Sequence, residues 1–214
     1  MPVKVGLRFI EKWGSNLENE IQKYEAEEVE KGQIVFYGPS NFTRWSTRFK
    51  HRPLREDLLG KSGKPCCINR GFGSSCPEQQ LYYYSRAIRP LEPKVLVYCG
   101  GGGNGISFGY TYEEMFELAQ RVIVYAKTDF PDLRIYVIGN NTWRGNKPQA
   151  ATYNQWMKEF AATIPDCKFF DPTDYAPLAR EDIYVEDKVH YNQMGYDIYG
   201  EWFKEVLKDE LAEF

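Results

Sequence analysis

The chain has 214 residues, of which 43% are hydrophobic and 27% are charged, and this ordinary globular composition excludes a disordered chain or a coiled coil. The length predicts a single domain over residues 1–214 with a substantial buried core. The 27 basic and 30 acidic side chains give a net charge of −3, which argues against nucleic-acid binding because such binding needs a basic face. With only two histidines, a multi-histidine metal site is excluded, and we expect no metal.

The cysteines and the amino-terminal residues indicate the cellular compartment in which the protein is expected. Five cysteines are odd in number and lack CxxC spacing, so they are typical of thiols in a reducing environment rather than of disulfides or a zinc site. The first residues contain no apolar run like that of a secretory signal, and no segment has the length of a membrane span. We therefore expect a cytoplasmic protein.

Short apolar runs alternate with amphipathic stretches along the chain. We predict strands at 33–37, 66–69, 95–99, 134–138 and 168–170, and helices at 15–31, 76–89, 112–127, 149–162 and 193–212. Residues 1–31 form a helical segment that packs on the rest of the domain. Capping boxes are predicted from the pairs Ser15/Glu18, Ser75/Glu78 and Thr111/Glu114.

This alternation predicts an α/β fold. Apolar strands separated by helices are typical of a parallel sheet covered on both faces, and right-handed crossovers then give a three-layer α/β/α sandwich. Ligands of such sheets bind beyond the carboxyl ends of the strands. The residues that follow the predicted strands are Ser40, Gly71, Gly100 to Asn104, and Asn140 with Asn141. We expect these residues to lie on one rim.

His190 is the first candidate for chemistry. Asp187 precedes it by three positions, close enough to accept a hydrogen bond from the imidazole, fix its tautomer and stabilise its cation. The alternative is a surface turn in which Asn192 caps the following helix.

Ser40 lies at the predicted rim, where a serine is either a nucleophile or a turn and capping residue. A serine hydroxyl needs a base, so the catalytic interpretation requires His190 to reach it. Phe42 takes the place of the last glycine of a G-x-S-x-G elbow, which argues against an α/β-hydrolase.

The glycine run from Gly100 to Gly103 has three interpretations. It lacks the lysine of a P-loop and a convincing G-x-G-x-x-G, which disfavours phosphate binding. It could let the backbone approach a ligand while Asn104 supplies an oxyanion donor, or it could be a mobile loop.

Taken together, these segments resemble the blocks of the SGNH/GDSL hydrolase superfamily over about residues 33–205. Residues 34–45, with Gly-Pro-Ser around Ser40, resemble the nucleophile block, and residues 69–73 the glycine block. Residues 97–104 resemble the asparagine block, and the stretch from Asp187 to Tyr196 is similar to the final Asp-x-x-His block.

The resemblance implies a role for each residue at a matching position. Ser40 would be the nucleophile, His190 the general base and then acid, and Asp187 its orienting carboxylate. The N–H groups of Ser40 and Gly71 and the side chain of Asn104 would form the oxyanion hole. The resemblance also implies a flavodoxin-like sheet of strand order 2-1-3-4-5 and no cofactor.

Two positions depart from the family pattern. Pro39 and Gly105 each stand where the family commonly has aspartate. The leading hypothesis is a serine esterase acting on small acyl esters, such as acetyl esters of carbohydrates, through a Ser-His-Asp triad. The alternatives are a catalytically weakened binding protein of the same fold and a flavodoxin-like nucleotide binder. The oligomeric state is left open.

The remaining aromatic and basic residues suggest secondary roles. We expect His51 to be a solvated surface residue, and Trp45 and the tyrosines at 82–84 to pack in the core or on a helix face. Residues 140–148 are predicted to form a mobile loop over the crevice. In that loop, Trp143 and Arg144 would contact substrate or pack the loop itself.

Overall fold

The structure, a computed structural model, describes residues 6–11, 14–101, 103–141 and 148–214. Its centre is a five-stranded, wholly parallel sheet of order β2-β1-β3-β4-β5. The strands are β1 (Ile34–Gly38), β2 (Cys67–Gly71), β3 (Val95–Tyr98), β4 (Arg134–Ile138) and β5 (Cys167–Phe170). The predicted fold class and strand order are confirmed.

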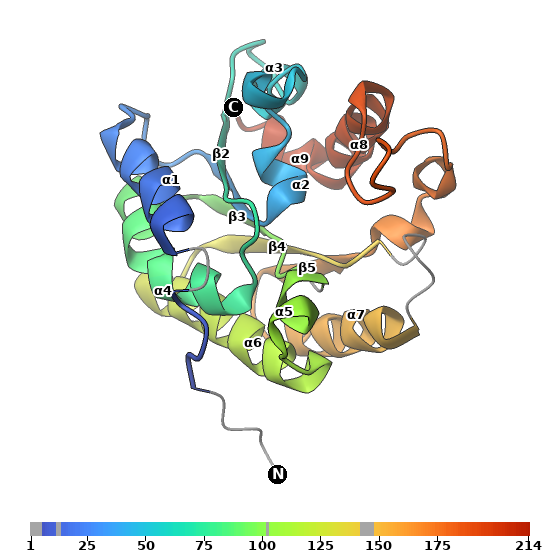
Figure 1. The fold of residues 1–214 in the computed structure, drawn as a ribbon. Coiled ribbons are helices and arrows are strands. Elements are labelled where there is room, and N and C mark those ends of the chain that lie inside the picture. The colour runs from blue at the N-terminus through green and yellow to red at the C-terminus, as the bar shows by residue number, and fades with distance from the viewer. Residues whose placement is uncertain (1–5, 12–13, 102, 142–147) are drawn as a thin grey trace.

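Helices cover both faces of this sheet (Figure 1). One face carries α1 (Gly14–Ala26), α4 (Pro77–Ala87), α6 (Tyr112–Asp129) and α7 (Pro148–Ala161). The other carries α2 (Ser40–Thr43), α3 (Leu54–Asp57), α8 (Gln193–Val206) and α9 (Lys208–Leu211). The predicted three layers are therefore present.

The alternation of side chains along each strand divides the core in two. Val35 and Tyr37 of β1 belong to the cluster that packs against α4 and α6, whereas Ile34 and Phe36 pack against α2 and α8. All four side chains are fully buried. Because both faces are covered, the strand is apolar at successive positions instead of at every second one.

The helix starts show where local sequence signals act. Thr111 and Glu114 form the predicted capping box of α6, with N–H to side-chain oxygen distances of 2.9 and 3.2 Å. The predicted box at Ser75 is wrong. The N-cap of α4 is Cys76, whose N–H donates to Gln79 Oε1 at 3.0 Å. The predicted Ser15/Glu18 box involves a side chain, that of Ser15, outside the described residues.

Several short elements have no counterpart among the predictions. They are α2, α3, α5 (Gly103–Phe108) and the 3-10 helices at Thr47–Phe49, Arg89–Leu91, Pro172–Asp174 and Ala176–Ala179. The last predicted helix is divided at Leu207 into α8 and α9. Elements of one or two turns are too short to show a helical period in sequence. Within the described ranges, no helix is long and apolar enough to cross a membrane.

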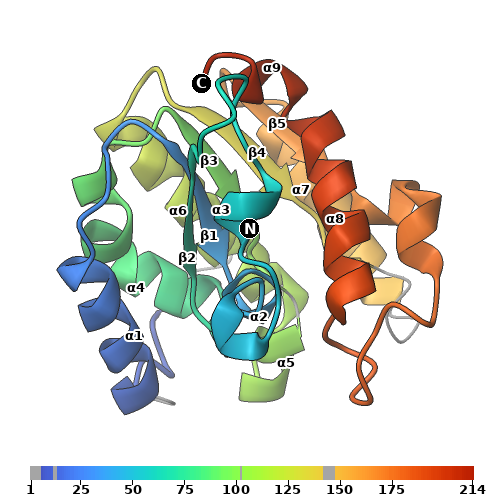
Figure 2. The same cartoon turned by 90° about the horizontal axis from the view of Figure 1, so that it is seen from above.

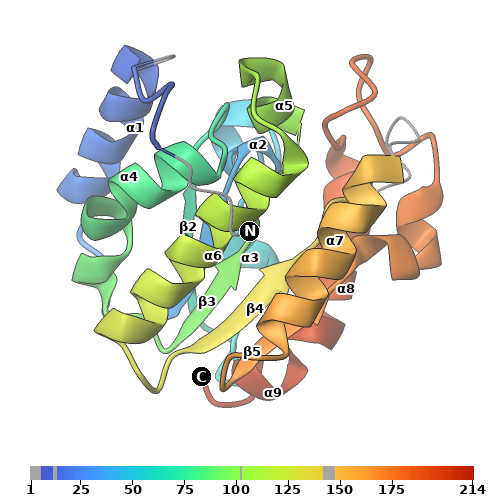
Figure 3. The same ribbon diagram turned by 90° about the horizontal axis from the view of Figure 1, so that it is seen from below.

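The carboxyl ends of the strands meet at one end of the molecule. There α2, α5 and the loop that leads into α8 lie around the same rim (Figures 2 and 3). As expected for a parallel sheet, residues far apart in sequence come together at this rim.

Candidate active site

A cavity of about 340 Å³ opens at the rim formed by the strand ends. Its wall includes Ser40 after β1, Asn104 after β3, Asn140 and Asn141 after β4, and Asp187 from the loop before α8. Four separate segments of the chain therefore contribute polar side chains to one cavity.

Ser40 is placed by a sharp turn from β1 into α2. The strand ends at Gly38, Pro39 is the N-cap, and Ser40 is the first residue of the helix. An N–H group in the first helical turn has no partner inside its own helix. In the described part of the chain, the Ser40 N–H has no acceptor, so it is available to a ligand in the cavity.

Ser40, His190 and Asp187 lie in one hydrogen-bonded line. His190 Nε2 is 2.9 Å from Ser40 Oγ, and His190 Nδ1 is 2.7 Å from Asp187 Oδ2. The serine and the histidine are 150 positions apart in sequence. The fold thus brings together the three residues to which the resemblance assigns catalysis.

Hydrogen bonds to Asp187 favour its ionised form. Its Oδ1 accepts from the backbone N–H groups of Val189 at 2.8 Å and His190 at 2.9 Å. Burial alone would raise the pKa of Asp187, but these two bonds and the imidazole bond outweigh it and lower the pKa below its usual value. A carboxylate that stays ionised can hold an imidazole in one tautomer and stabilise its cation.

The loop that carries His190 is fixed at both sides. The His190 carbonyl accepts from the Val185 N–H at 2.9 Å. Downstream, Asn192 caps α8 by accepting from the Gly195 N–H at 3.0 Å, as the alternative interpretation of this loop expected. These backbone contacts restrict the motion of the imidazole relative to the helix.

Asn104 reaches the cavity from the first turn of α5. Its Nδ2 donates to the Ser75 carbonyl at 2.9 Å, which holds the amide in place. An amide nitrogen has two N–H groups, so one remains for a ligand.

Gly105 follows Asn104 because the helices leave no space for a side chain there. A Cβ at this position would lie 2.0 Å from Met115 Sδ on α6. The close approach of α5 to α6 therefore accounts for the glycine where the family commonly has aspartate.

Pro39 is likewise explained by packing. Gly101 has a φ of +68°, and a Cβ added to it would lie 2.7 Å from Pro39 Cγ. The glycine loop after β3 therefore folds closely over the proline ring. The position where the family commonly has a carboxylate is therefore packed against this loop.

Gly71 is not brought to the cavity. It lies in β2, buried, and its N–H donates to Asn69 Oδ1 at 2.9 Å. A Cβ at Gly71 would lie 2.5 Å from the Thr43 nitrogen, so the glycine permits α2 to pack on β2. Its N–H is bonded to Asn69, and Gly71 is not part of the cavity wall, in contrast to the oxyanion-hole role that the resemblance implies.

Polar residues of the cavity wall that were given no catalytic or binding role from sequence include Asn41, Tyr199 and the expected rim residues Asn140 and Asn141. Asn41 directly follows Ser40, and Asn140 and Asn141 directly follow β4. The position of these three residues after strands was therefore enough to predict that they lie near the cavity. Tyr199 lies on α8, and its sequence neighbourhood gives no hint of the cavity. Trp143 and Arg144 lie outside the described residues.

His51 differs from its predicted surface role. Its ring is half-buried and packs on Tyr196, with ring centroids 4.8 Å apart, and desolvation lowers its pKa. Trp45, in contrast, is fully buried as predicted. Over the described ranges, no cluster of three His, Cys, Asp or Glu side chains could hold a metal ion.

We compared the chain with family models, with curated proteins and with solved structures, and the solved structures indicate its fold. No family model matches the sequence, and no curated protein matches it. A solved GDSL-like lipase from Bacteroides thetaiotaomicron is 18% identical, with 92% of this chain and 98% of that chain covered and a TM-score of 0.66. A family 3 carbohydrate esterase from Clostridium thermocellum is 14% identical, with coverages of 85% and 98% and a TM-score of 0.61.

A third solved structure is a catalytic mutant of an acetylxylan esterase from Geobacillus stearothermophilus. It is 12% identical, covers 87% of this chain and 99% of its own, and has a TM-score of 0.61. All three chains are matched over nearly their whole length, as expected for one shared architecture. The chain therefore has the fold of the SGNH/GDSL hydrolases.

Proposed function

We propose that this chain is a serine hydrolase that cleaves small acyl esters through Ser40, His190 and Asp187. The observation that carries the proposal is the continuous line of hydrogen bonds from Ser40 Oγ through the imidazole to Asp187 at the wall of a cavity. A nucleophile, its base and the orienter of that base are the minimum arrangement for acyl transfer by a serine.

In the first half of the reaction, Ser40 Oγ attacks the ester carbonyl while His190 Nε2 takes its proton. The imidazolium is stabilised by Asp187 and then protonates the leaving alcohol, which gives an acyl-serine. In the second half, a water molecule deprotonated by His190 attacks the acyl group. The acid leaves, and the proton returns to Ser40.

The negative charge that develops on the carbonyl oxygen needs donors. We assign this role to the Ser40 N–H and to the second N–H of the Asn104 amide, both of which are unengaged in the described part of the chain. One such donor is typically worth about 2.7–4 kcal/mol in the transition state.

The cavity wall favours a neutral, hydroxyl-rich alcohol. Asn41, Asn104, Asn140 and Asn141 line it, whereas the charged side chains in its described wall are Asp187 and Lys188 alone. Carboxamides both donate and accept hydrogen bonds, as recognition of sugar hydroxyls requires. Two neighbours of this fold are described as a carbohydrate esterase and an acetylxylan esterase. We propose acetylated carbohydrates as the substrate class.

The test is hydrolysis of p-nitrophenyl acetate and of an acetylated methyl glycoside by the full chain. Activity should disappear in Ser40→Ala and in His190→Ala, and it should persist in Ser85→Ala, which removes an exposed serine from α4. Equal rates in the wild type and in both site variants would reject the enzyme and favour a binding protein. Activity on p-nitrophenyl acetate alone would reject the carbohydrate assignment.

A further inference from the structure

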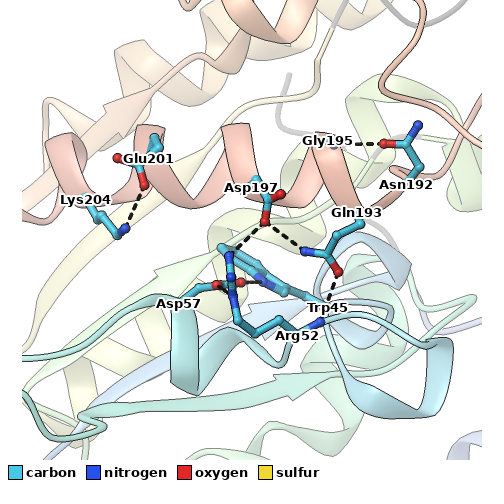
Figure 4. A network of polar contacts seen from close by, with 9 residues as sticks. All are labelled: Trp45, Arg52, Asp57, Asn192, Gln193, Gly195, Asp197, Glu201 and Lys204. Carbon is cyan, nitrogen blue, oxygen red and sulfur yellow. Dashed lines mark hydrogen bonds and ion pairs between the residues drawn. The ribbon is translucent and has the colours of Figure 1, made fainter.

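Asp57 is a buried carboxylate in a network of polar contacts that reaches α8 (Figure 4). It ends α3, and its side chain is 4% exposed. One oxygen, Oδ2, accepts from Trp45 Nε1 at 2.6 Å, and the other, Oδ1, accepts from Arg52 Nε. A carboxylate removed from water is stable only with such partners.

Arg52 extends this network to the first turns of α8. Its Nη2 lies 2.8 Å from Asp197 Oδ1, and its backbone N–H donates to Gln193 Oε1 at 3.1 Å. Gln193 Nε2 in turn donates to Asp197 Oδ1 at 2.9 Å. One guanidinium therefore bridges two carboxylates on different elements, which its planar fork permits and a single ammonium group does not.

A second connection runs from Trp45 to the residue that follows the nucleophile. The Trp45 ring stacks on the Tyr196 ring, with centroids 5.6 Å apart and an interplanar angle of 30°. The Tyr196 hydroxyl donates to the Asn41 carbonyl at 3.0 Å. Both aromatic side chains are fully buried. The start of α8 is thus connected to α2 through Tyr196 and Asn41, and to the end of α3 through Arg52 and Asp57.

We propose that Arg52 is a positioning residue that sets the alignment of His190 with Ser40, and this rests on the ester hydrolysis proposed above. Gln193 begins α8 and follows His190 by three positions, so a shift of this helix end moves the imidazole. Ser40 begins α2, and the bridge reaches the segment just after α2 through the hydrogen bond from Trp45 Nε1 to Asp57. A displacement of about 1 Å between reacting groups can cost about 10²-fold in rate.

Two variants separate positioning from simple stabilisation. Asp197→Ala removes the acceptor on α8 and leaves the pair between the exposed Arg52 and the buried Asp57 intact. Arg52→Lys keeps a positive charge beside Asp57 but cannot bridge both carboxylates. Each should lower kcat by about tenfold with KM nearly unchanged, because substrate contacts are retained while the reacting atoms are misaligned.

The matched control is Lys204→Ala, which removes an exposed ion pair with Glu201 elsewhere on α8. It should leave kcat unchanged, and its unfolding midpoint should equal that of Asp197→Ala. Wild-type kcat in both Arg52→Lys and Asp197→Ala would overturn the proposal. An equal loss of kcat in all three variants would also overturn it, because the effect would then follow general destabilisation.

A spectroscopic measurement distinguishes this proposal from the proposed function. With only two histidines in the chain, the His190 imidazole resonances can be assigned by NMR through their loss in His190→Ala. They should shift in Asp197→Ala and stay in place in Lys204→Ala. Unchanged resonances and rates would reject positioning while leaving ester hydrolysis intact. Shifted resonances in a chain that hydrolyses no ester would support the connection and reject the function.

Discussion

Asp187 acts on the proposed reaction only through His190. Its side chain is 42% exposed, yet it holds the imidazole at 2.7 Å and two backbone N–H groups of its own loop. Asp187→Asn should therefore lower kcat by about 10⁴-fold, because an amide favours the wrong imidazole tautomer. Ester hydrolysis measures the loss of kcat, and thermal unfolding measures any loss of stability separately.

A control for this variant lies in the same region of the chain. Asp182→Asn weakens an exposed ion pair with Arg180. Because exposed ion pairs contribute at most about 1 kcal/mol of stability, this variant should keep a kcat within about twofold of wild type. A kcat in Asp187→Asn equal to that of Asp182→Asn would rule out the orienting role.

Gly105 offers a second prediction for a single residue. Gly105→Ala forces a methyl group into the position of Met115 Sδ and should cost about 1–3 kcal/mol of folding free energy. It should also lower kcat, because Asn104 precedes it on the same helical turn. Chemical denaturation and ester hydrolysis check both expectations.

The structure provides two comparisons for this prediction. Gly103→Ala places a methyl group on the same helix where no atom lies within 4 Å, so it should be nearly neutral for folding. Adding Met115→Ala to Gly105→Ala reopens the space and should restore part of kcat. If the double variant is no better than the single one, crowding against Met115 is not the cause.

Within the candidate site, residues differ in how far sequence could place them. Asp187 and His190 are neighbours on one loop, so their pairing follows from spacing alone. Ser40 needed the parallel-sheet rule, which puts the ends of distant strands at one rim. Gly71 was misjudged because the contact that determines it, with Thr43 of α2, is tertiary and leaves no mark in the local sequence.

At the scale of elements, α8 packs on the sheet and follows the loop that carries His190, so the proposed reaction depends on it. Asn192→Ala removes the cap of α8 and a bond from its Nδ2 to the Asp182 carbonyl. It should cost about 1 kcal/mol of stability, as caps generally do, and it should also lower kcat because His190 lies two positions before it.

Thr111→Ala is the matched helix variant for this prediction. It removes the cap of α6 and should cost a similar free energy of about 1 kcal/mol. Its kcat should fall less than that of Asn192→Ala. Equal losses of kcat would show that stability, not the helix that carries His190, governs the rate.

The strands were predictable, whereas the shortest helices were not. Continuous apolar runs such as Val95–Tyr98 mark strands buried on both faces, and their predicted limits lie within two residues of the observed ones. In contrast, α2 and α5 contain four and six residues, and α2 packs on the sheet whereas α5 packs on α6. These two helices carry Ser40 and Asn104, so the least predictable elements position the site.

At the scale of the whole molecule, Phe203 joins α8 to the sheet. Its ring centroid lies 5.0 Å from that of Phe36 on β1 and 6.0 Å from that of Trp45. Phe203→Ala should destabilise the protein by about 3–5 kcal/mol through lost burial and the cavity left behind. Val124→Ala, at an exposed position of α6, should change stability by less than about 0.5 kcal/mol.

The 150 positions between Ser40 and His190 have a consequence for synthesis of the chain. A polypeptide that has emerged from the ribosome as far as residue 180 contains all five strands and Ser40, but it lacks His190, the base proposed to activate that serine. The proposed hydrolysis therefore requires synthesis to have passed residue 190. Fragments that end before His190 should hydrolyse no ester, even where the sheet has formed.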